Sequence, residues 1–291
     1  MEIRYKDKVL EVEKGSKIYD IFKNEIENSE NTVVGAIYNN TYVNLSRHMN
    51  FEGRVELISI NSKIGIKIYR RTLTYIMGKA FWHTYPEAHV IVNYQLSNAM
   101  YCDIENMEVT DEMIEKVKAK MQEIINQDLK IEKKVTRDEA EKFYKETNSP
   151  KGRLQFDLED RQNINMYYCD EYYNYIYEII ATHTGATKVF DLQKYSKGFL
   201  LRYPSTKNVN ELPEFHETKK LLWALQEYET IYKVLNVGTV YRLNKAIKEN
   251  TIKYLILLSE ALHEKKISQM ADKIAERKGV KMVLIAGPSS S

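Results

Sequence analysis

The chain has little cysteine, little net charge and no long apolar run, and each shortage excludes a class of protein. Two cysteines occur among the 291 residues, Cys102 and Cys169, far apart and without C-x-x-C spacing. That excludes a disulfide framework and a zinc knuckle, and it favours a reducing compartment. The formal net charge is +2, so no global field attracts nucleic acid, and any RNA binding must rest on a local patch.

The chain also lacks the signals of secretion and membrane insertion. Its first residues, MEIRYKDKVLEVEKG, contain no apolar signal core, and its longest uncharged apolar run is too short to cross a bilayer. With 43% hydrophobic residues, the chain has room for two domains that each bury a core. We expect a soluble cytoplasmic protein that has no membrane partner.

Residues 1–62 predict one compact unit of two strands, a helix and three further strands. A cap signal at Gly15-Ser16 precedes apolar residues at helical spacing, and Asn39-Asn40 is typical of a tight turn. This order is typical of a ubiquitin-like small fold. The expected strands are residues 3–5, 9–12, 33–38, 41–45 and 55–60.

The chain becomes helical after residue 206. Apolar residues recur at steps of three and four over 221–235, 240–249 and 252–274, with Asn236-Val237-Gly238 and Asn250 between the helices. Gly279 ends the last helix.

The last eleven residues, KMVLIAGPSSS, predict a buried strand that leads into a phosphate-binding loop. Met282–Ala286 forms an apolar run that needs neighbouring strands. The motif G-x-x-x-x-G-K-[ST] cradles phosphate with backbone amides. We expect the chain to be cut inside this loop; the alternative is a solvated tail. The first five positions of the motif are Gly287, Pro288, Ser289, Ser290 and Ser291.

Two stretches resemble the front part of threonyl-tRNA synthetases. Residues 36–60, AIYNNTYVNLSRHMNFEGRVELISI, resemble the second half of their TGS domain, a β-grasp module. Residues 70–80, RRTLTYIMGKA, resemble the R-H-x-x-A-H-L-L-x-x-A helix of their second additional, editing domain, and the likeness runs to about residue 206. The resemblance implies an α+β protein with a TGS-like domain at 1–62, an editing-like domain at 63–206 and a helical connector at 207–280.

The resemblance also implies where editing chemistry would lie. The family uses two histidines four residues apart on that helix, then a cysteine and a histidine four apart on a later segment. The first pair falls on Arg71 and Tyr75, and an ungapped count puts the second pair on Ile176 and Ile180. Because isoleucine cannot ligate metal, accept a proton or attack a substrate, we predict no deacylase activity and no metal site.

Tyrosine is abundant, with 22 residues, and six of them lie in MYYCDEYYNYIYEI, residues 166–179. Stacked tyrosines can hold a base, so Tyr172, Tyr173 and Tyr175 form a predicted ligand groove. Cross-strand packing of the same rings is the alternative.

Two basic sets are the remaining local features. Lys63, Lys67, Arg70 and Arg71 have no acid between them, and a second set within residues 130–137 is interrupted only by Glu132. Such sets contact phosphates or serve as solvated charges in linkers and at helix ends.

The segments GTVYRLNKAI and SEALHEKKISQMADKIAERKGVKMVLIAGPSSS resemble bacterial uridine kinase-like nucleoside kinases that carry synthetase-like front domains. That resemblance implies a parent ATP:uridine 5′-phosphotransferase that uses ATP and Mg²⁺. This chain would be its inactive binding or regulatory region, which senses a nucleoside, a nucleotide or RNA. The alternatives are a synthetase-related RNA-binding protein or trans-editing hydrolase of mischarged tRNA, and a homo-oligomeric scaffold whose helices pair between chains.

Overall fold

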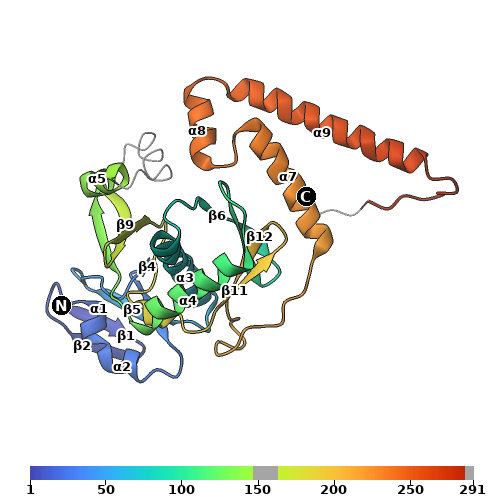
Figure 1. Cartoon of the computed structure of the whole chain (residues 1–291). Helices are drawn as coiled ribbons and strands as arrows, with labels where there is room; N and C mark the ends of the chain where they lie inside the picture. The colour runs from blue at the N-terminus through green and yellow to red at the C-terminus, as the bar shows by residue number, and fades with distance from the viewer. Residues whose placement is uncertain (147–162, 286–291) are drawn as a thin grey trace. The chain divides into compact units, whose positions relative to one another are not determined.

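The computed structural model describes residues 1–146 and 163–285 and has an α+β fold with mixed sheets, which confirms the predicted fold class. The chain divides into two compact units, Met1–Trp223 and Ala224–Ser291. Figure 1 shows the strands gathered in the blue-to-yellow part of the chain and the orange and red part made of helices.

The first sheet is built from residues 2–59 and has the strand order β2-β1-β5-β3-β4. Strands β1 and β5 are parallel and the other neighbours are antiparallel. Ile3, Ile18, Phe22 and Val55 are fully buried in its core. The expected single helix is divided at Phe22, whose φ of −105° and ψ of 22° depart from helical values. The elements are β1 (Glu2–Tyr5), β2 (Lys8–Glu11), α1 (Ile18–Ile21), α2 (Lys23–Glu27), β3 (Val33–Tyr38), β4 (Thr41–Val43) and β5 (Gly53–Ser59).

Helix α3 (Lys63–Thr84) is the longest helix of the first unit and is buried along most of its length. The Ser62 hydroxyl accepts a hydrogen bond from the Gly65 amide at 3.0 Å and so caps the helix. The helix ends just before Tyr85-Pro86, as the proline predicts.

Helix α3 lies against a four-stranded antiparallel sheet of order β11-β12-β7-β6 and against helix α4 (Figure 1). Helix α4 is capped by Thr110, whose hydroxyl accepts from the Met113 amide at 3.2 Å, and it buries Ile114, Val117 and Met121. These elements are β6 (Val90–Leu96), β7 (Ala99–Ile104), α4 (Asp111–Asn126), β11 (Asp191–Tyr195) and β12 (Gly198–Arg202).

A third, antiparallel sheet of order β10-β9-β8 brings the tyrosine-rich segment to the other side of α3. Asp170 and Glu171 have φ of 42° and 63°, the left-handed geometry that a two-residue hairpin turn requires. The elements are β8 (Glu132–Thr136), α5 (Arg137–Glu146), β9 (Asn163–Cys169), β10 (Tyr172–Tyr175) and the 3₁₀ turn η1 (Thr184–Ala186).

The predicted helices after residue 206 are confirmed as α7 (Lys219–Leu235), α8 (Val240–Lys248) and α9 (Ile252–Ala275). Helix α7 ends at Asn236, whose φ is 55°, and the Thr239 hydroxyl caps α8. No helix in the described ranges is long and apolar enough to cross a membrane.

The strand predicted over Met282–Ala286 is not found in residues 281–285, which carry no regular secondary structure. Met282 is 76% and Leu284 is 88% exposed. A strand is stable only when neighbours pair its backbone groups, and no strand in the described part of the chain pairs with this segment. The predicted loop residues Gly287 to Ser291 lie outside the described residues.

The start of α3 packs so closely on the first sheet that only glycine fits at position 65. A Cβ atom on Gly65 would lie 2.0 Å from the Ser59 carbonyl oxygen, so Gly65→Ala must push the helix from the sheet. We expect the free energy of unfolding to fall by about 1–3 kcal/mol, measured by urea denaturation.

The control is Gly238→Ala, whose Cβ would meet no atom closer than 3.9 Å and which should change stability by less than about 0.5 kcal/mol. Equal effects of the two substitutions would contradict the close approach at Gly65.

Candidate functional site

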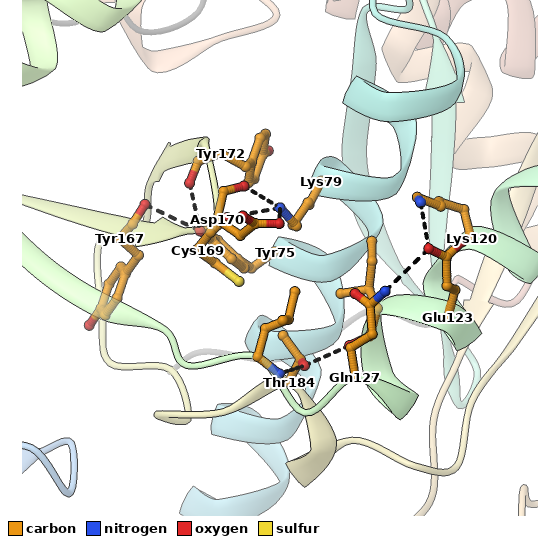
Figure 2. Close-up of polar contacts among 12 residues, drawn as sticks. Tyr75, Lys79, Lys120, Glu123, Gln127, Tyr167, Cys169, Asp170, Tyr172 and Thr184 are labelled. Carbon is orange, nitrogen blue, oxygen red and sulfur yellow. Dashed lines mark hydrogen bonds and ion pairs between the residues drawn. The ribbon is translucent and has the colours of Figure 1, made fainter.

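One face of α3 points at the β9–β10 hairpin and carries Arg71, Tyr75 and Lys79 at intervals of four residues. Residues four apart lie above one another on a helix, so these side chains form a single column. Figure 2 shows Tyr75 and Lys79 reaching from α3 to the backbone around Cys169, Asp170 and Tyr172.

Tyr75 is fully buried and ties α3 to both strands of the hairpin. Its hydroxyl lies 3.1 Å from the Tyr172 carbonyl oxygen and 3.3 Å from the Tyr167 carbonyl oxygen. Its ring also meets the Tyr172 ring edge-on, with 5.3 Å between centroids. Tyr75 is therefore a packing residue whose hydroxyl serves backbone acceptors.

The Lys79 side chain binds the backbone at the turn of the hairpin. Its ammonium donates to the carbonyl oxygens of Cys169 at 2.9 Å and Asp170 at 2.5 Å. The Asp170 carboxylate lies 3.7 Å away, and the Lys79 side chain is 1% exposed. Burial lowers the pKa of Lys79, and the charges around Cys169 and Asp170 oppose that shift. Sequence analysis missed this residue, although its place eight residues after Arg71 on a buried helical face was a signal.

Arg71 completes the column and holds the segment that follows the hairpin. It forms an ion pair with Glu178, and its guanidinium donates to the Ile179 carbonyl oxygen at 3.5 Å. Burial lowers the pKa of Arg71, and the neighbouring Arg70 adds to the effect. The group serves as a structural cation here.

The two isoleucines predicted for the second half of the editing set lie beside this column. Ile180 is fully buried and Ile176 is half-buried against the same core. The adjoining Ala181 amide donates to the Thr72 hydroxyl at 2.9 Å, which holds the segment on α3. The structure thus gathers all four predicted positions in one region without a carboxylate, imidazole or thiol among them. Within residues 1–146 and 163–285, no three His, Cys, Asp or Glu side chains are grouped to hold a metal ion. The equivalence of these positions to an editing site stays a prediction.

The three tyrosines of the predicted ligand groove lie on β10 and contact other rings or apolar residues. Tyr172 contacts Trp82 with 5.9 Å between ring centroids, and Tyr173 contacts Tyr168 across the strands at 4.5 Å. Tyr175 packs with Tyr173 against a small buried cluster. These contacts fit the cross-strand alternative, and a ligand role for the three residues stays a prediction.

A basic groove lies beside the first turns of α3 and encloses about 390 Å³. Lys63 and Lys67 are exposed on its wall, and neither has an ion-pair partner among the described residues. Arg70 donates to the Gln95 side chain at 3.2 Å, and its guanidinium lies 5.9 Å from the centre of the Tyr203 ring. Three cations and no acid occur among its lining residues, which are Lys63, Ile66, Lys67, Arg70, Gln95, Ser97, Asn98, Tyr203, Pro204, Ser205, Thr206 and Pro213.

The far wall of the basic groove is held by side chains that donate hydrogen bonds to backbone carbonyl oxygens. The Asn98 amide group donates to the Glu214 carbonyl oxygen at 2.7 Å, and the Arg202 guanidinium donates to the Pro213 carbonyl oxygen. The loop after β12 is therefore fixed against the β6–β7 turn.

The other charged surfaces are more nearly neutralised. In the second basic set, Lys130 pairs with Glu132 at 2.6 Å and Arg137 pairs with Glu141 at 2.7 Å. A larger hollow of about 680 Å³ lies between the first sheet and the end of α4, but its Asp128 carboxylate already accepts from the Gly185 amide at 2.9 Å. The basic groove is thus the clearest site for an anionic ligand.

No family model matches the chain, but curated relatives share its sequence. A threonine–tRNA ligase of Clostridium kluyveri is 32% identical over 163 residues, which are 55% of this chain and 26% of that protein. That of Clostridium tetani is 32% identical over 171 residues, 57% of this chain and 27% of the relative. That of Clostridioides difficile is 27% identical over 256 residues, 87% of this chain and 36% of the relative. The chain therefore spans about a quarter to a third of the length of these relatives.

These relatives correct the function expected from the end of the chain. They are threonine–tRNA ligases, and one similarity spans 87% of this chain, which includes helices that we had assigned to a kinase connector. The hypothesis of a uridine or nucleoside kinase parent is therefore wrong, and uridine and ATP lose their support as partners. The error has a physical source: GPSSS contains one glycine of the P-loop motif but neither its second glycine nor its lysine. A requirement for ATP and Mg²⁺ is not tested and rested on that hypothesis.

Removal of the Lys79 ammonium should lower the free energy of unfolding by a large amount. Lys79→Met leaves the buried Cys169 carbonyl oxygen and the partly buried Asp170 carbonyl oxygen without their donor, so the free energy of unfolding should fall by about 2–4 kcal/mol in urea denaturation. Lys67→Met, on the exposed side of the same helix, is the matched control and should cost less than about 0.5 kcal/mol. A neutral Lys79→Met would show that the hairpin does not depend on the ammonium.

The raised pKa of Tyr167 leads us to expect a loss of stability at alkaline pH. Burial raises the pKa of Tyr167 to about 12, whereas an unfolded tyrosine ionises near pH 10. The stability that this group contributes is complete below pH 10 and declines from about pH 10 to pH 12, by up to about 3 kcal/mol.

Denaturation midpoints at pH 9 and pH 11 for the wild type and Tyr167→Phe would measure this effect. The variant should lose less stability between the two pH values, and the same change at Tyr177, which is 70% exposed, should not alter the loss. The lowered pKa of Lys79 makes stability rise with pH, opposite to the effect of Tyr167. The test is therefore the difference in lost stability between the wild type and Tyr167→Phe. Equal losses in these two proteins would contradict the raised pKa of Tyr167.

Proposed function

We propose that this chain is an RNA-binding region related to the front part of threonyl-tRNA synthetases, and that the basic groove beside α3 is its phosphate-binding surface. The groove, with three cations and no acid among its lining residues, is the observation that carries the proposal. The finer fold assignment belongs to it: a TGS-like β-grasp domain at 1–62, an editing-like domain at 63–206 and a helical connector at 207–280. The similarity to threonine–tRNA ligases over more than half of the chain supports this assignment.

The spacing of the cations suits a nucleic-acid backbone. Lys63, Lys67 and Arg70 lie at i, i+4 and i+7 on one side of α3, a span of about 10 Å at 1.5 Å per residue. Phosphates of one strand follow one another at about 3.4 Å along a duplex axis, so the span of the three groups corresponds to about three such steps, or about four consecutive phosphates. A local cluster overcomes the small net charge of +2.

The groove is built to hold a backbone and not to read bases. Tyr203 is the aromatic residue of the lining, it is only 8% exposed, and the Arg70 guanidinium already lies over its ring. A base therefore has no open ring on which to stack there. Phosphate contacts position RNA without specifying its sequence, so we infer that binding through this groove depends on the shape and charge of the RNA.

The column of side chains on α3 offers no group arranged for deacylation. Arg71 is held by Glu178, and the Tyr75 hydroxyl lies between two carbonyl oxygens. Ile180 is fully buried, so neither side chain nor solvent offers a nucleophile at that point. RNA binding without hydrolysis is the reading that both the groove and the column favour.

Replacing the two exposed lysines of the groove tests RNA binding. Lys63→Gln together with Lys67→Gln should weaken binding of unacylated tRNA about tenfold or more, and should reduce the slope of log K against log salt by about two. The measurement is a fluorescence titration at several salt concentrations. The matched control, Lys8→Gln with Lys14→Gln, removes the same charge from exposed positions of the first sheet region and should change the slope by less than about one. Equal losses in both double variants would show non-specific attraction, and no tRNA binding by the wild type would overturn the proposal.

A deacylation assay tests the hydrolase alternative. We expect seryl-tRNA to lose its amino acid at the spontaneous rate in the presence of the chain, because the four predicted editing positions hold Arg71, Tyr75 and two isoleucines, and the nearby Glu178 and Asp170 carboxylates are paired with Arg71 and Lys79. Hydrolysis that Tyr75→Phe abolishes would restore the hydrolase.

A further inference from the structure

Helix α9 carries an apolar face that no helix of the described chain covers. Four large side chains on it are between 40% and 51% exposed, namely Ile256, Ile267, Met270 and Ile274. A neighbouring face of the same helix, with Leu255, Leu258 and Leu262, is half-buried. Near this second face, Lys266 forms an ion pair with Glu227 of α7. Helix α9 thus already packs on one side and presents a second apolar surface to solvent.

The exposed residues follow a heptad pattern. Steps of four, three, four, three and four residues join Ile256, Glu260, His263, Ile267, Met270 and Ile274. We call this row the α9 seam. A repeat of alternating threes and fours stays on one face of a helix and is the pattern of a coiled-coil contact. The α9 seam extends over about 27 Å at 1.5 Å per residue, which is enough for several layers of side chains.

Two charged or polar residues interrupt the α9 seam, and they indicate what covers it. In a parallel pair of identical helices, Glu260 would meet the same carboxylate of its partner, and like charges facing each other are unfavourable. In an antiparallel pair centred between Ala261 and Leu262, Glu260 faces the partner's His263, and Ile256 faces the partner's Ile267. Each of these layers occurs twice, once on either side of the twofold axis. In this register the part of the α9 seam from Ile256 to Ile267 is complementary to itself, whereas Met270 and Ile274 face Lys253 and Glu249 of the partner.

We propose that α9 pairs antiparallel with α9 of a second copy of this chain, with Glu260 facing the partner's His263 in both halves of the contact. An interface of this kind uses the same patch on both copies and closes as a twofold dimer. The central polar layers select the register, as single polar residues do in coiled coils, and the isoleucine layers on either side supply the apolar burial. This dimer goes beyond the proposed RNA binding and does not depend on it.

Sedimentation of the whole chain tests the dimer. At about 0.01–0.5 mM, concentrations that populate contacts of micromolar to sub-millimolar affinity, we expect the mass to rise from one chain to two. Ile267→Glu on the α9 seam should return the mass to one chain, whereas Leu257→Glu, which is 65% exposed and lies off the seam, should not. Circular dichroism checks that both variants keep their helices. A wild type that stays monomeric throughout, as when another part of the chain covers the seam, would overturn the proposal, as would equal effects of the two variants.

Charge exchange tests the register. Glu260→Lys alone removes the carboxylate that the partner's imidazole would contact, and His263→Glu alone puts two carboxylates opposite each other, so each should weaken the dimer about tenfold or more. The double variant places a lysine opposite a carboxylate in each polar layer and should recover the wild-type dissociation constant to within about threefold. Lys265→Glu, on the opposite side of α9, is the control and should leave it unchanged. A double variant no tighter than the single ones would contradict the antiparallel register.

Discussion

The buried ammonium of Lys79 is the contact on which the arrangement around α3 depends. A buried cation is costly unless polar groups surround it, and here the carbonyl oxygens of the left-handed turn after β9 supply that surrounding. The turn and the helix therefore stabilise each other. The hairpin carbonyl oxygens accept the hydrogen bonds of the Lys79 ammonium, and these bonds hold the hairpin against α3. Tyr75, one helical turn earlier, adds a second tie to the strands of the same hairpin.

This closure explains why the inner side of α3 is structural and its outer side is available for binding. Along the inner column, the polar groups of Arg71, Tyr75 and Lys79 all contact other groups of the protein. At the start of the helix, Lys63 and Lys67 remain exposed beside a groove whose far wall is fixed by a hydrogen bond from the Asn98 side chain to the Glu214 carbonyl oxygen. One helix thus separates a closed polar network from an open basic surface.

The two proposed surfaces draw on different forces. The basic groove depends on unpaired cations, so salt screens it. The α9 seam depends mainly on apolar burial and uses charge only to choose a register. Each surface also lies within one of the two compact units. The proposed RNA binding and the proposed association of chains can therefore be tested separately.

The sequence by itself determined the α+β class, the strand run of the first sheet, the long helix that ends before Tyr85-Pro86 and the three later helices, because periodicity and turn residues act locally. Sequence also led to a wrong kinase assignment, since five residues of a loop motif carry no context. Only the tertiary structure decided that Lys79 is buried, that Phe22 divides the first helix, and that residues 281–285 form no strand. It also brought Arg70 to Tyr203 across 133 positions of sequence. These features arise from contacts between distant segments, and the residues of one segment do not specify which partner will meet them.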